Sequence, residues 1–180
     1  QLWNSYSFFA TYASVDGYDP NKNKVNYIDV SIMDKWIISK LNVFIRDCNS
    51  SLEQFRSDIM MRKFDLFLDD LSNWYIRRSR RRFWKSEDDL DKQTAYQVLY
   101  ECLTTVIKLI SPVLPFVTEE IYQNLVKNID SDERESIHLC DYPSSDLKKR
   151  DIELMKNIDS LRRVVELGRS ARNKAKIKIR

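Results

Sequence analysis

The stretch that decides the fold class runs from Ser31 to Phe55 and reads SIMDKWIISKLNVFIRDCNSSLEQF. Ser31 and Asp34 stand three residues apart, as in a capping box, so the pattern predicts a helix N-terminus at Ser31. Apolar residues then recur every three or four positions, which is the period of one buried helix face. These residues are Met33, Ile37, Leu41, Phe44, Cys48, Leu52 and Phe55. The stretch therefore predicts an amphipathic helix of about six turns.

Three further stretches show the same period. A second helix, which Asp58 can cap, is expected to run into Trp74, a third after the acidic residues 87–91, and a fourth from Pro115 to Val126. Pro112 should end the third helix, because proline has no amide hydrogen to donate. The expected buried residues are Met60, Phe64, Phe67 and Leu71 on the second helix, and Ala95, Leu99, Cys102, Val106 and Leu109 on the third.

The two ends of the chain complete an all-α prediction. Residues 3–14 read as a short apolar helix, and residues 137–142 as a short extended segment. A last long helix is expected from Ser145 to Ala175, and Ile177 then alternates with basic residues like the start of a strand, as if the fold were truncated at this end. The residues expected to face inward on the long helix are Leu147, Leu154, Ile158, Leu161, Val165 and Gly168.

The composition supports a helix bundle. The 180 residues include only two glycines and four prolines, whereas sheets joined by tight turns need more of both. Hydrophobic residues make up 43% and charged residues 32%, which is typical of a globular protein, and the net charge is only +3. Cys48 and Cys102 lie on apolar stripes and are expected to be reduced core residues. No apolar run is long enough to cross a bilayer. We expect a part of a longer cytoplasmic protein.

A second stretch, residues 73–85, is unusually basic and reads NWYIRRSRRRFWK. Guanidinium groups grip phosphate oxygens in a bidentate way, and flat aromatic rings can stack on unpaired bases. The stretch therefore favours RNA or another polyanion as a partner. The candidates for phosphate contact are Arg77, Arg78, Arg80, Arg81, Arg82 and Lys85, and the candidates for base stacking are Phe83 and Trp84.

Other interpretations of this basic stretch stay open. A run of charges is usually a solvated face, and the helix dipole favours one or two cations at a helix C-terminus. Acidic residues at 69–70 and 87–91 are close enough in sequence to pair with some of the arginines. Trp74 and Tyr75 continue the stripe of the second helix, so we expect them to pack in the core.

The sequence contains no recognisable catalytic or metal site. With only Gly17 and Gly168, it has no glycine-rich phosphate loop. His138 is the only histidine, and the three cysteines form no C-x-x-C pair, so neither a catalytic triad nor a zinc site is expected. The adjacent acidic pairs at 69–70 and 119–120 diverge on a helix instead of converging on a substrate.

Taken together, the motifs resemble the anticodon-binding domain of class I aminoacyl-tRNA synthetases of the isoleucine–valine–leucine branch. They are most similar to the isoleucyl-tRNA synthetases of the eukaryote-like type. The resemblance covers nearly the whole chain in the expected order, and the segment 70–84 is its most specific part. The segments that carry it are 3–12, 34–41, 70–84, 109–122 with its Pro-Phe-x-Thr-Glu-Glu signature, and 137–143 together with 167–172.

This resemblance implies a domain that binds the anticodon stem-loop of isoleucine tRNA in a cytoplasmic, monomeric enzyme. The enzyme would attach isoleucine to its tRNA with ATP and Mg²⁺. The family's His-Ile-Gly-His and Lys-Met-Ser-Lys-Ser signatures are missing from the chain, so catalysis is expected elsewhere and no cofactor is expected here. The RNA-binding track would be extended by Arg169, Arg172, Lys174 and Lys176.

The resemblance also suggests a division of the chain. Residues 1–30 would be a connector that leaves the catalytic domain, residues 31–143 the anticodon-binding bundle, and residues 144–180 a long helix leading to the C-terminal region. Two alternatives remain. The bundle could be a scaffold whose basic segment docks the enzyme's own catalytic domain in cis, or the equivalent domain of a valyl-type synthetase.

Overall fold

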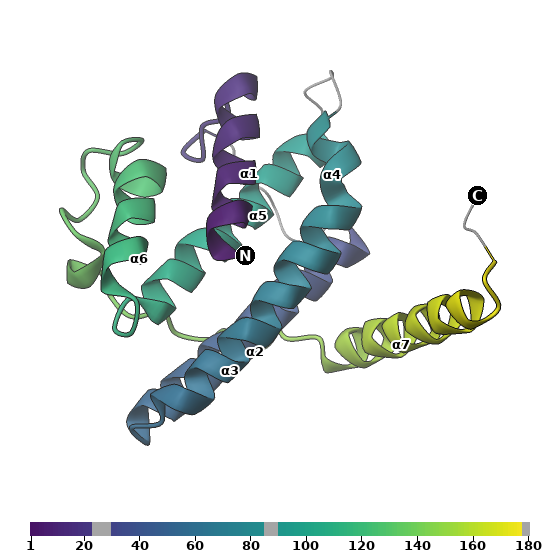
Figure 1. Ribbon diagram of the computed structural model, residues 1–180. Helices are drawn as coiled ribbons and strands as arrows, with labels where there is room; N and C mark the ends of the chain where they lie inside the picture. Colours follow the sequence, from purple (N-terminus) through teal and green to yellow (C-terminus); the bar gives the residue numbers. More distant parts are fainter. Residues whose placement is uncertain (23–29, 85–89, 178–180) are drawn as a thin grey trace.

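A computed structural model describes residues 1–22, 30–84 and 90–177 (Figure 1). The secondary structure of these residues is helical and contains no strand, which confirms the all-α prediction. Segments labelled η are π-helical (η1, η2) or single 3-10 turns (η3, η4). In chain order the elements are α1 (Leu2–Asp16), α2 (Ile32–Glu53), α3 (Ser57–Asp69), η1 (Asp70–Ile76), α4 (Arg77–Trp84), α5 (Leu90–Ile110), α6 (Pro115–Tyr122), η2 (Gln123–Lys127), η3 (Ile137–Leu139), η4 (Leu147–Lys149) and α7 (Ile152–Lys174).

Helix α2 begins with the predicted capping box. The Ser31 hydroxyl accepts a hydrogen bond from the Asp34 backbone N–H, and the Asp34 carboxylate accepts one from the Ser31 N–H, both at 3.2 Å. The predicted stripe is buried in its central part, from Ile37 to Cys48. Its last residue is not: the helix ends at Glu53, and Phe55 lies in the following turn, in the left-handed region (φ 55°) and almost fully exposed. The turn that leads into α3 therefore shortens the stripe.

Helix α3, η1 and α4 follow one another without a break and form a single rod beside α2 (Figure 1). The predicted Asp58 cap is wrong, because α3 already begins at Ser57. The Asp58 carboxylate instead forms an ion pair (Nε–Oδ1 2.8 Å) with Arg56, the residue that precedes the helix. The rod places Leu71, Tyr75 and Phe83 in the core, together with Ser79. A spacing of four overshoots an α-helical turn by about 40° each time. The wider π-helical turn of η1 offsets part of this drift.

Helix α5 crosses the bundle, and all five predicted stripe residues, from Ala95 to Leu109, are fully buried. Helix α1 packs against it: the ring of Phe9 lies 5.9 Å from that of Tyr96, edge to face. Phe9 and Ala13 belong to the same buried cluster as α5. The N-terminal segment is therefore part of the bundle core.

Helix α6 starts at Pro115 as predicted, and the helical path continues through η2 to Lys127. Thr118 is fully buried and donates to the Leu114 carbonyl at 2.8 Å. The Glu119 carboxylate fastens the next loop, because its Oε2 accepts hydrogen bonds from the Ser136 hydroxyl (2.8 Å) and the Ile137 backbone N–H (3.1 Å). Thr118 and Glu119 of the Pro-Phe-x-Thr-Glu-Glu signature therefore stabilise the local structure of α6 and of the loop that follows it.

Two predictions near the C-terminus are corrected. The segment expected to be extended begins with a 3-10 turn at Ile137–Leu139, and extended backbone starts only at Cys140. The last helix starts at Ile152 and not at Ser145, because Asp151 caps it by accepting a hydrogen bond from the Leu154 N–H (2.8 Å). Asp146 likewise caps the separate turn η4.

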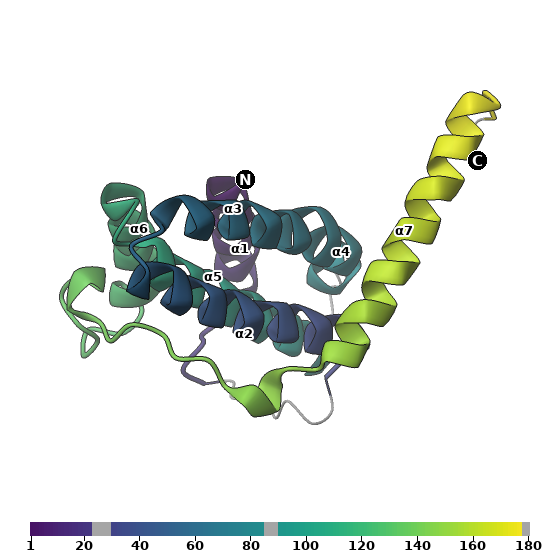
Figure 2. The same cartoon turned by 90° about the horizontal axis from the view of Figure 1, so that it is seen from below.

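Helix α7 projects from one side of the bundle (Figure 2). Met155 is buried, and Leu154 and Ile158 pack against the core. Three of the residues expected to face inward are exposed: Leu147, Leu161 and Gly168. The apolar pattern continues farther along the helix than the bundle that covers it.

Candidate nucleic-acid interface

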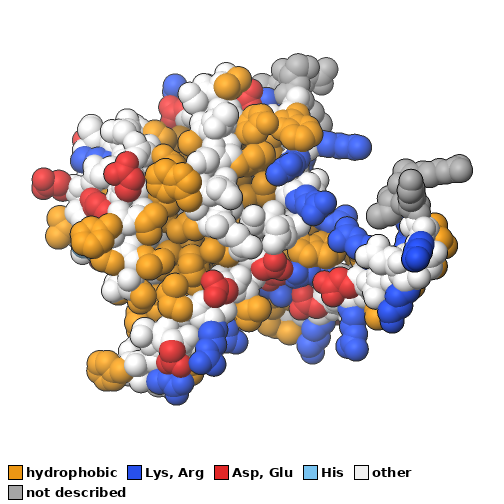
Figure 3. Space-filling model, in the orientation of Figure 1, with side chains coloured by type: hydrophobic (Ala, Val, Ile, Leu, Met, Phe, Trp, Pro, Cys, Tyr) orange, Lys and Arg blue, Asp and Glu red, His pale blue; other side chains and the backbone are white. Residues whose placement is uncertain are grey.

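The exposed face of α4 carries most of the arginine cluster. At 100° per residue, Arg77, Arg80, Arg81 and Trp84 fall within about 100° of one another on the helix surface. All four are exposed, and Trp84 retains 55% of its accessible surface. Figure 3 shows basic side chains over α4 and over α7, on the side from which α7 projects. This face combines guanidinium groups with an exposed indole ring, which suits contact with phosphates and a base.

Arg82 points the other way, into the bundle. Its Nη1 and Nη2 donate to the two carboxylate oxygens of Asp34 at 2.7 and 2.9 Å, and Asp34 is fully buried. Burial by itself lowers the pKa of Arg82, but the hydrogen bonds to Asp34 outweigh it and leave the pKa raised. Its Nε also lies 2.9 Å from Asp91 Oδ1. Since its guanidinium is already engaged, the predicted phosphate contact of Arg82 does not fit its position.

Phe83 is a core residue and not a stacking platform. Its ring packs edge to face on Phe8 (5.2 Å between centroids) and on Tyr96 (5.0 Å), and only 2% of its surface is exposed. The prediction that it stacks on a base therefore does not fit. Of the two candidates for stacking, Trp84 is the exposed one. Lys85, the last residue of the basic stretch, lies outside the described residues.

The two other aromatic residues of the stretch separate in the structure. Tyr75 is fully buried, as expected, and donates to Asp34 Oδ1 at 2.6 Å. Burial raises its pKa, and the Asp34 charge raises it further. Trp74 is only half-buried. The guanidinium carbon of Arg78 lies 4.8 Å from its ring centroid, and that of Arg162 lies 4.6 Å away.

Of the basic residues predicted on the last helix, Arg169, Arg172 and Lys174 lie on its outer half, and Lys176 lies just past its end at Lys174. Arg169, Lys174 and Lys176 are exposed, and Arg172 is half-buried. They are separated in sequence from α4 by about ninety residues, yet α7 projects on the side of the bundle on which α4 lies (Figures 1 and 2). The structure thus places both predicted basic groups on one side of the molecule.

Sequence reasoning missed two residues that organise this region. Asp34 was considered only as a capping residue, whereas it also anchors Tyr75 and Arg82. Arg162 stands among other charged residues in the sequence and is not distinguished from ordinary surface charge there, whereas it is paired with Asp69 and Asp70 of the rod. The adjacent acids Asp69 and Asp70 give only a weak sequence signal for an ion pair with Arg162. The partners of Asp34 and of Arg162 all lie far away in sequence.

Two kinds of feature are absent from the described ranges, 1–22, 30–84 and 90–177. These ranges contain no group of three or more His, Cys, Asp or Glu side chains arranged to hold a metal ion. None of the helices in these ranges combines the length and the apolar character that crossing a membrane requires.

Comparison with known proteins identifies the family. Residues 34–180 match the family described as the anticodon-binding domain of tRNA ligase. The isoleucine–tRNA ligase of Clostridium novyi (strain NT) is 47% identical over 179 residues, which are 99% of this chain and 17% of that protein. The isoleucine–tRNA ligase of Dehalococcoides mccartyi (strain CBDB1) is 48% identical over 179 residues, which are 99% of this chain and 18% of that protein.

The chain therefore belongs to the anticodon-binding domains of tRNA ligases, and its close relatives are isoleucine–tRNA ligases. It spans less than a fifth of the length of these relatives.

Proposed function

We propose that this domain binds the anticodon stem-loop of isoleucine tRNA within an isoleucine–tRNA ligase. The exposed face of α4 carries the proposal, because Arg77, Arg80 and Arg81 share this face with the exposed ring of Trp84. The arginines would contact phosphates and the indole would stack on a loop base. The basic residues of α7 would contact the same RNA. The relatives named above are isoleucine enzymes, which favours isoleucine over the valine alternative.

The full-length enzyme would attach isoleucine to its tRNA with ATP and Mg²⁺. We place that chemistry outside residues 1–180, since the stretch contains neither of the ATP-site signatures of its class. The domain would then contribute RNA binding and orientation, and no cofactor of its own. We also propose that the enzyme is a cytoplasmic monomer, as the resemblance to its class suggests.

The salt dependence of stem-loop binding tests the proposal. Replacing Arg77 and Arg81 by Gln should weaken binding of an isoleucine anticodon stem-loop. The slope of log K against log salt should fall by roughly one unit for each phosphate contact that is lost. The matched control replaces Arg62 and Lys63 by Gln, which removes the same charge at exposed positions on α3. These lie about 22 Å along the rod, beyond the screening length of about 10 Å.

Equal slopes for the two double variants would exclude α4 as the phosphate-binding face. Complete loss of binding only in the α4 variant, with unchanged helix content, would support it.

A second candidate function, docking of the ligase's own catalytic domain, is favoured by a different surface. A groove of about 640 Å³ with both polar and apolar lining, Asp65 and Asp69 included, lies between the start of α1, α3 and α6. Its lining includes Trp3, Leu68, Leu114 and Val117, and hydrophobic side chains are visible on this face in Figure 3. Replacing Val117 by Asp should then reduce aminoacylation by the full-length enzyme without changing the affinity of the isolated domain for the stem-loop.

A further inference from the structure

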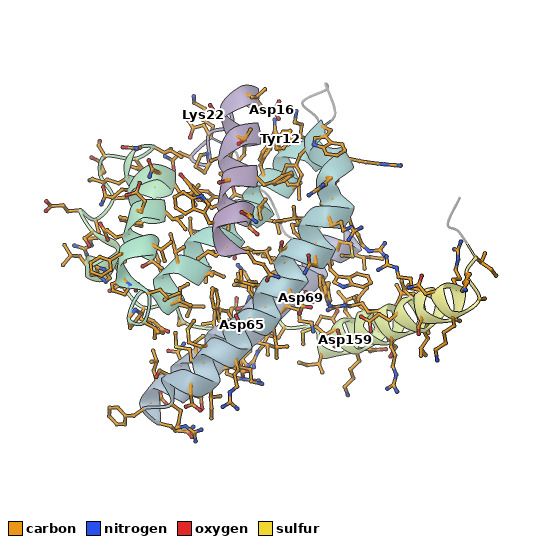
Figure 4. The ribbon with its side chains drawn as sticks, in the orientation of Figure 1. Tyr12, Asp16, Lys22, Asp65, Asp69 and Asp159 are labelled. Atoms are coloured by element: carbon orange, nitrogen blue, oxygen red, sulfur yellow. The ribbon has the colours of Figure 1, made fainter. Side chains whose placement is uncertain are left out.

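The base of α7 is fastened to the bundle by charged side chains around two tryptophans. Lys40 Nζ of α2 lies 3.1 Å from Asp159 Oδ1 of α7 and 3.4 Å from Asp70 Oδ2 of the rod. It also lies 5.8 Å from the ring of the buried Trp36. Figure 4 labels Asp69 on the rod and Asp159 on α7, where the two helices come together. One ammonium group therefore joins three elements at this point.

Arg162 makes the main contact between α7 and the rod. Its Nη1 contacts Asp70 Oδ1, its Nη2 lies 3.2 Å from Asp69 Oδ2, and only 15% of its side chain is exposed. The guanidinium also lies over the Trp74 ring at 4.6 Å. Arg78 of α4 lies over the same ring at 4.8 Å. Trp74 thus links a guanidinium of α4 to a guanidinium of α7.

The π-helical segment explains why the rod can serve both neighbours. Asp70 and Trp74 lie in η1 and contact Arg162 of α7. Tyr75, in the same segment, donates a hydrogen bond to Asp34 of the other neighbour, α2. π-helical turns are rare and recur at functional positions. Here the turn coincides with the residues that hold α7.

Beyond Arg162 the helix extends away from the bundle, so a small change of angle at its base moves its far end. Every residue from 163 to 177 is exposed except Val165 and Arg172, which are half-buried. Lys174 lies twelve residues past Arg162, about 18 Å along the axis at 1.5 Å per residue. A tilt of about 20° at the base would move that end by about 6 Å. Contacts at the base therefore decide where the basic residues at the far end lie.

We propose that Arg162 is a positioning residue for RNA binding. Paired with Asp69 and Asp70 and laid on Trp74, it fixes the direction of α7 relative to α4, so that both helices contact one stem-loop together. This rests on the proposed function of the domain. Two surfaces held in a fixed relation bind more tightly than the same surfaces on a loose joint, because the second contact forms at a high effective concentration.

A pair of neighbouring arginines provides the first test. The contacts of Arg162 with Asp69, Asp70 and Trp74 are called the latch. Arg162→Met removes one charge and the latch, whereas Arg163→Met removes one charge from an exposed position on the same helix. Arg162→Met should weaken stem-loop binding about tenfold or more, and Arg163→Met should weaken it less than about threefold. Arg162→Lys, which keeps the charge and can still reach the two carboxylates, should recover part of the loss. Equal effects of the two Met variants would overturn the proposal.

Neutralising an acid gives a test in which the two explanations predict opposite signs. If only the net charge mattered, removing a carboxylate near the RNA would tighten binding. If the latch matters, Asp70→Asn should weaken binding several-fold, while the exposed control Asp65→Asn should leave it unchanged or slightly tighter. Asp69→Asn, at a half-buried position, repeats the test should Asp70→Asn fail to fold. Tighter binding by the latch variants would contradict the proposal.

A distance measurement decides the question without RNA. Spin labels at Leu66→Cys on α3 and Ser170→Cys on α7, both exposed positions, report the angle of α7 when Cys140 is replaced by Ser. Arg162→Met should broaden the distance distribution, and Arg163→Met should not. An unchanged distribution in Arg162→Met would refute the latch. Failure of the wild-type domain to bind the stem-loop would instead count against the proposed function.

Discussion

The Arg82 guanidinium and the Asp34 carboxylate form a bidentate ion pair inside the bundle, with both N–O distances below 3 Å. Breaking such a pair from one side leaves a buried charge without its partner. Arg82→Met should therefore destabilise the domain by about 3–5 kcal/mol. Urea denaturation followed by circular dichroism measures this change.

The neighbouring Arg81→Met is the control for that experiment, because Arg81 is exposed. Its stability should stay within about 0.5 kcal/mol of the wild type. A similar loss in both variants would mean that the pair contributes no more than general helix charge.

Phe83 and Trp84 are adjacent aromatic residues with opposite exposure. Phe83→Ala should reduce stability by about 3–5 kcal/mol, because it opens a cavity between Phe8 and Tyr96. Trp84→Ala should change stability little and weaken stem-loop binding by about 1–3 kcal/mol. Thermal melts and a binding titration of both variants separate the two effects. A large loss of stability in Trp84→Ala would place its ring against the bundle in solution.

Acid should destabilise the domain in part through Glu119. Partial burial raises the pKa of Glu119, but hydrogen bonds from Gln123, Ser136 and the Ile137 N–H outweigh it, so the pKa lies below its usual value. A carboxyl with a lowered folded-state pKa stabilises the fold above its unfolded pKa of about 4.3, and this contribution disappears as pH falls through the folded value.

Glu119→Gln should therefore cost about 1 kcal/mol at pH 7. Its stability should approach that of the wild type between about pH 4.5 and pH 3. Urea midpoints at these pH values measure the difference. A gap that stays constant down to pH 3 would show that the charge on Glu119 does not matter. Desolvation raises the pKa of Asp16, but its hydrogen bonds with Lys92 and Tyr96 outweigh this and leave the pKa lowered. Asp16 therefore adds to the acid sensitivity of the wild type and of Glu119→Gln alike.

The three thiols should react at very different rates. Burial raises the pKa of Cys48 to about 12, and burial also raises that of Cys102 well above its usual value. Cys140 is only half-buried. A thiol reagent at pH 8 should therefore modify one site per chain quickly, and Cys140→Ser should remove this fast phase. Fast modification of two sites would indicate that α2 or α5 opens in solution.

The helices themselves followed from local patterns in the sequence. Ser31 and Asp34 cap α2 through bonds within four residues, and the α5 stripe is buried on the face that its period predicts. Such features depend only on residues near in sequence. The start of α7 was misplaced because Asp146 and Asp151 each cap a separate segment, and the apolar period of the region does not register the break between them.

The division of the arginine cluster could be predicted only in part. The burial of Phe83 depends on the π-helical turn, because in a regular α-helix it would lie about 120° out of phase with Leu71, whereas the burial of Tyr75, four residues after Leu71, was within reach of the sequence. The partner of Arg82 was not, because Asp34 lies 48 residues away and becomes a neighbour only when α2 packs against the rod. The same holds for Arg162, whose carboxylate partners lie more than ninety residues earlier.

The π-helical turn between Asp69 and Arg77 also gives the rod one position where its length can change. Such a turn accommodates one residue more than an α-helical path over the same rotation. Deleting Ser72 should let the turn relax to α-helix and leave Phe83 and Arg82 facing inward. Deleting Arg62 from regular α3 should rotate α4 by about 100°. Only the first deletion should preserve the fold, and it should shorten the spacing of Asp70 and Trp74 from four residues to three, which changes the contacts that hold α7.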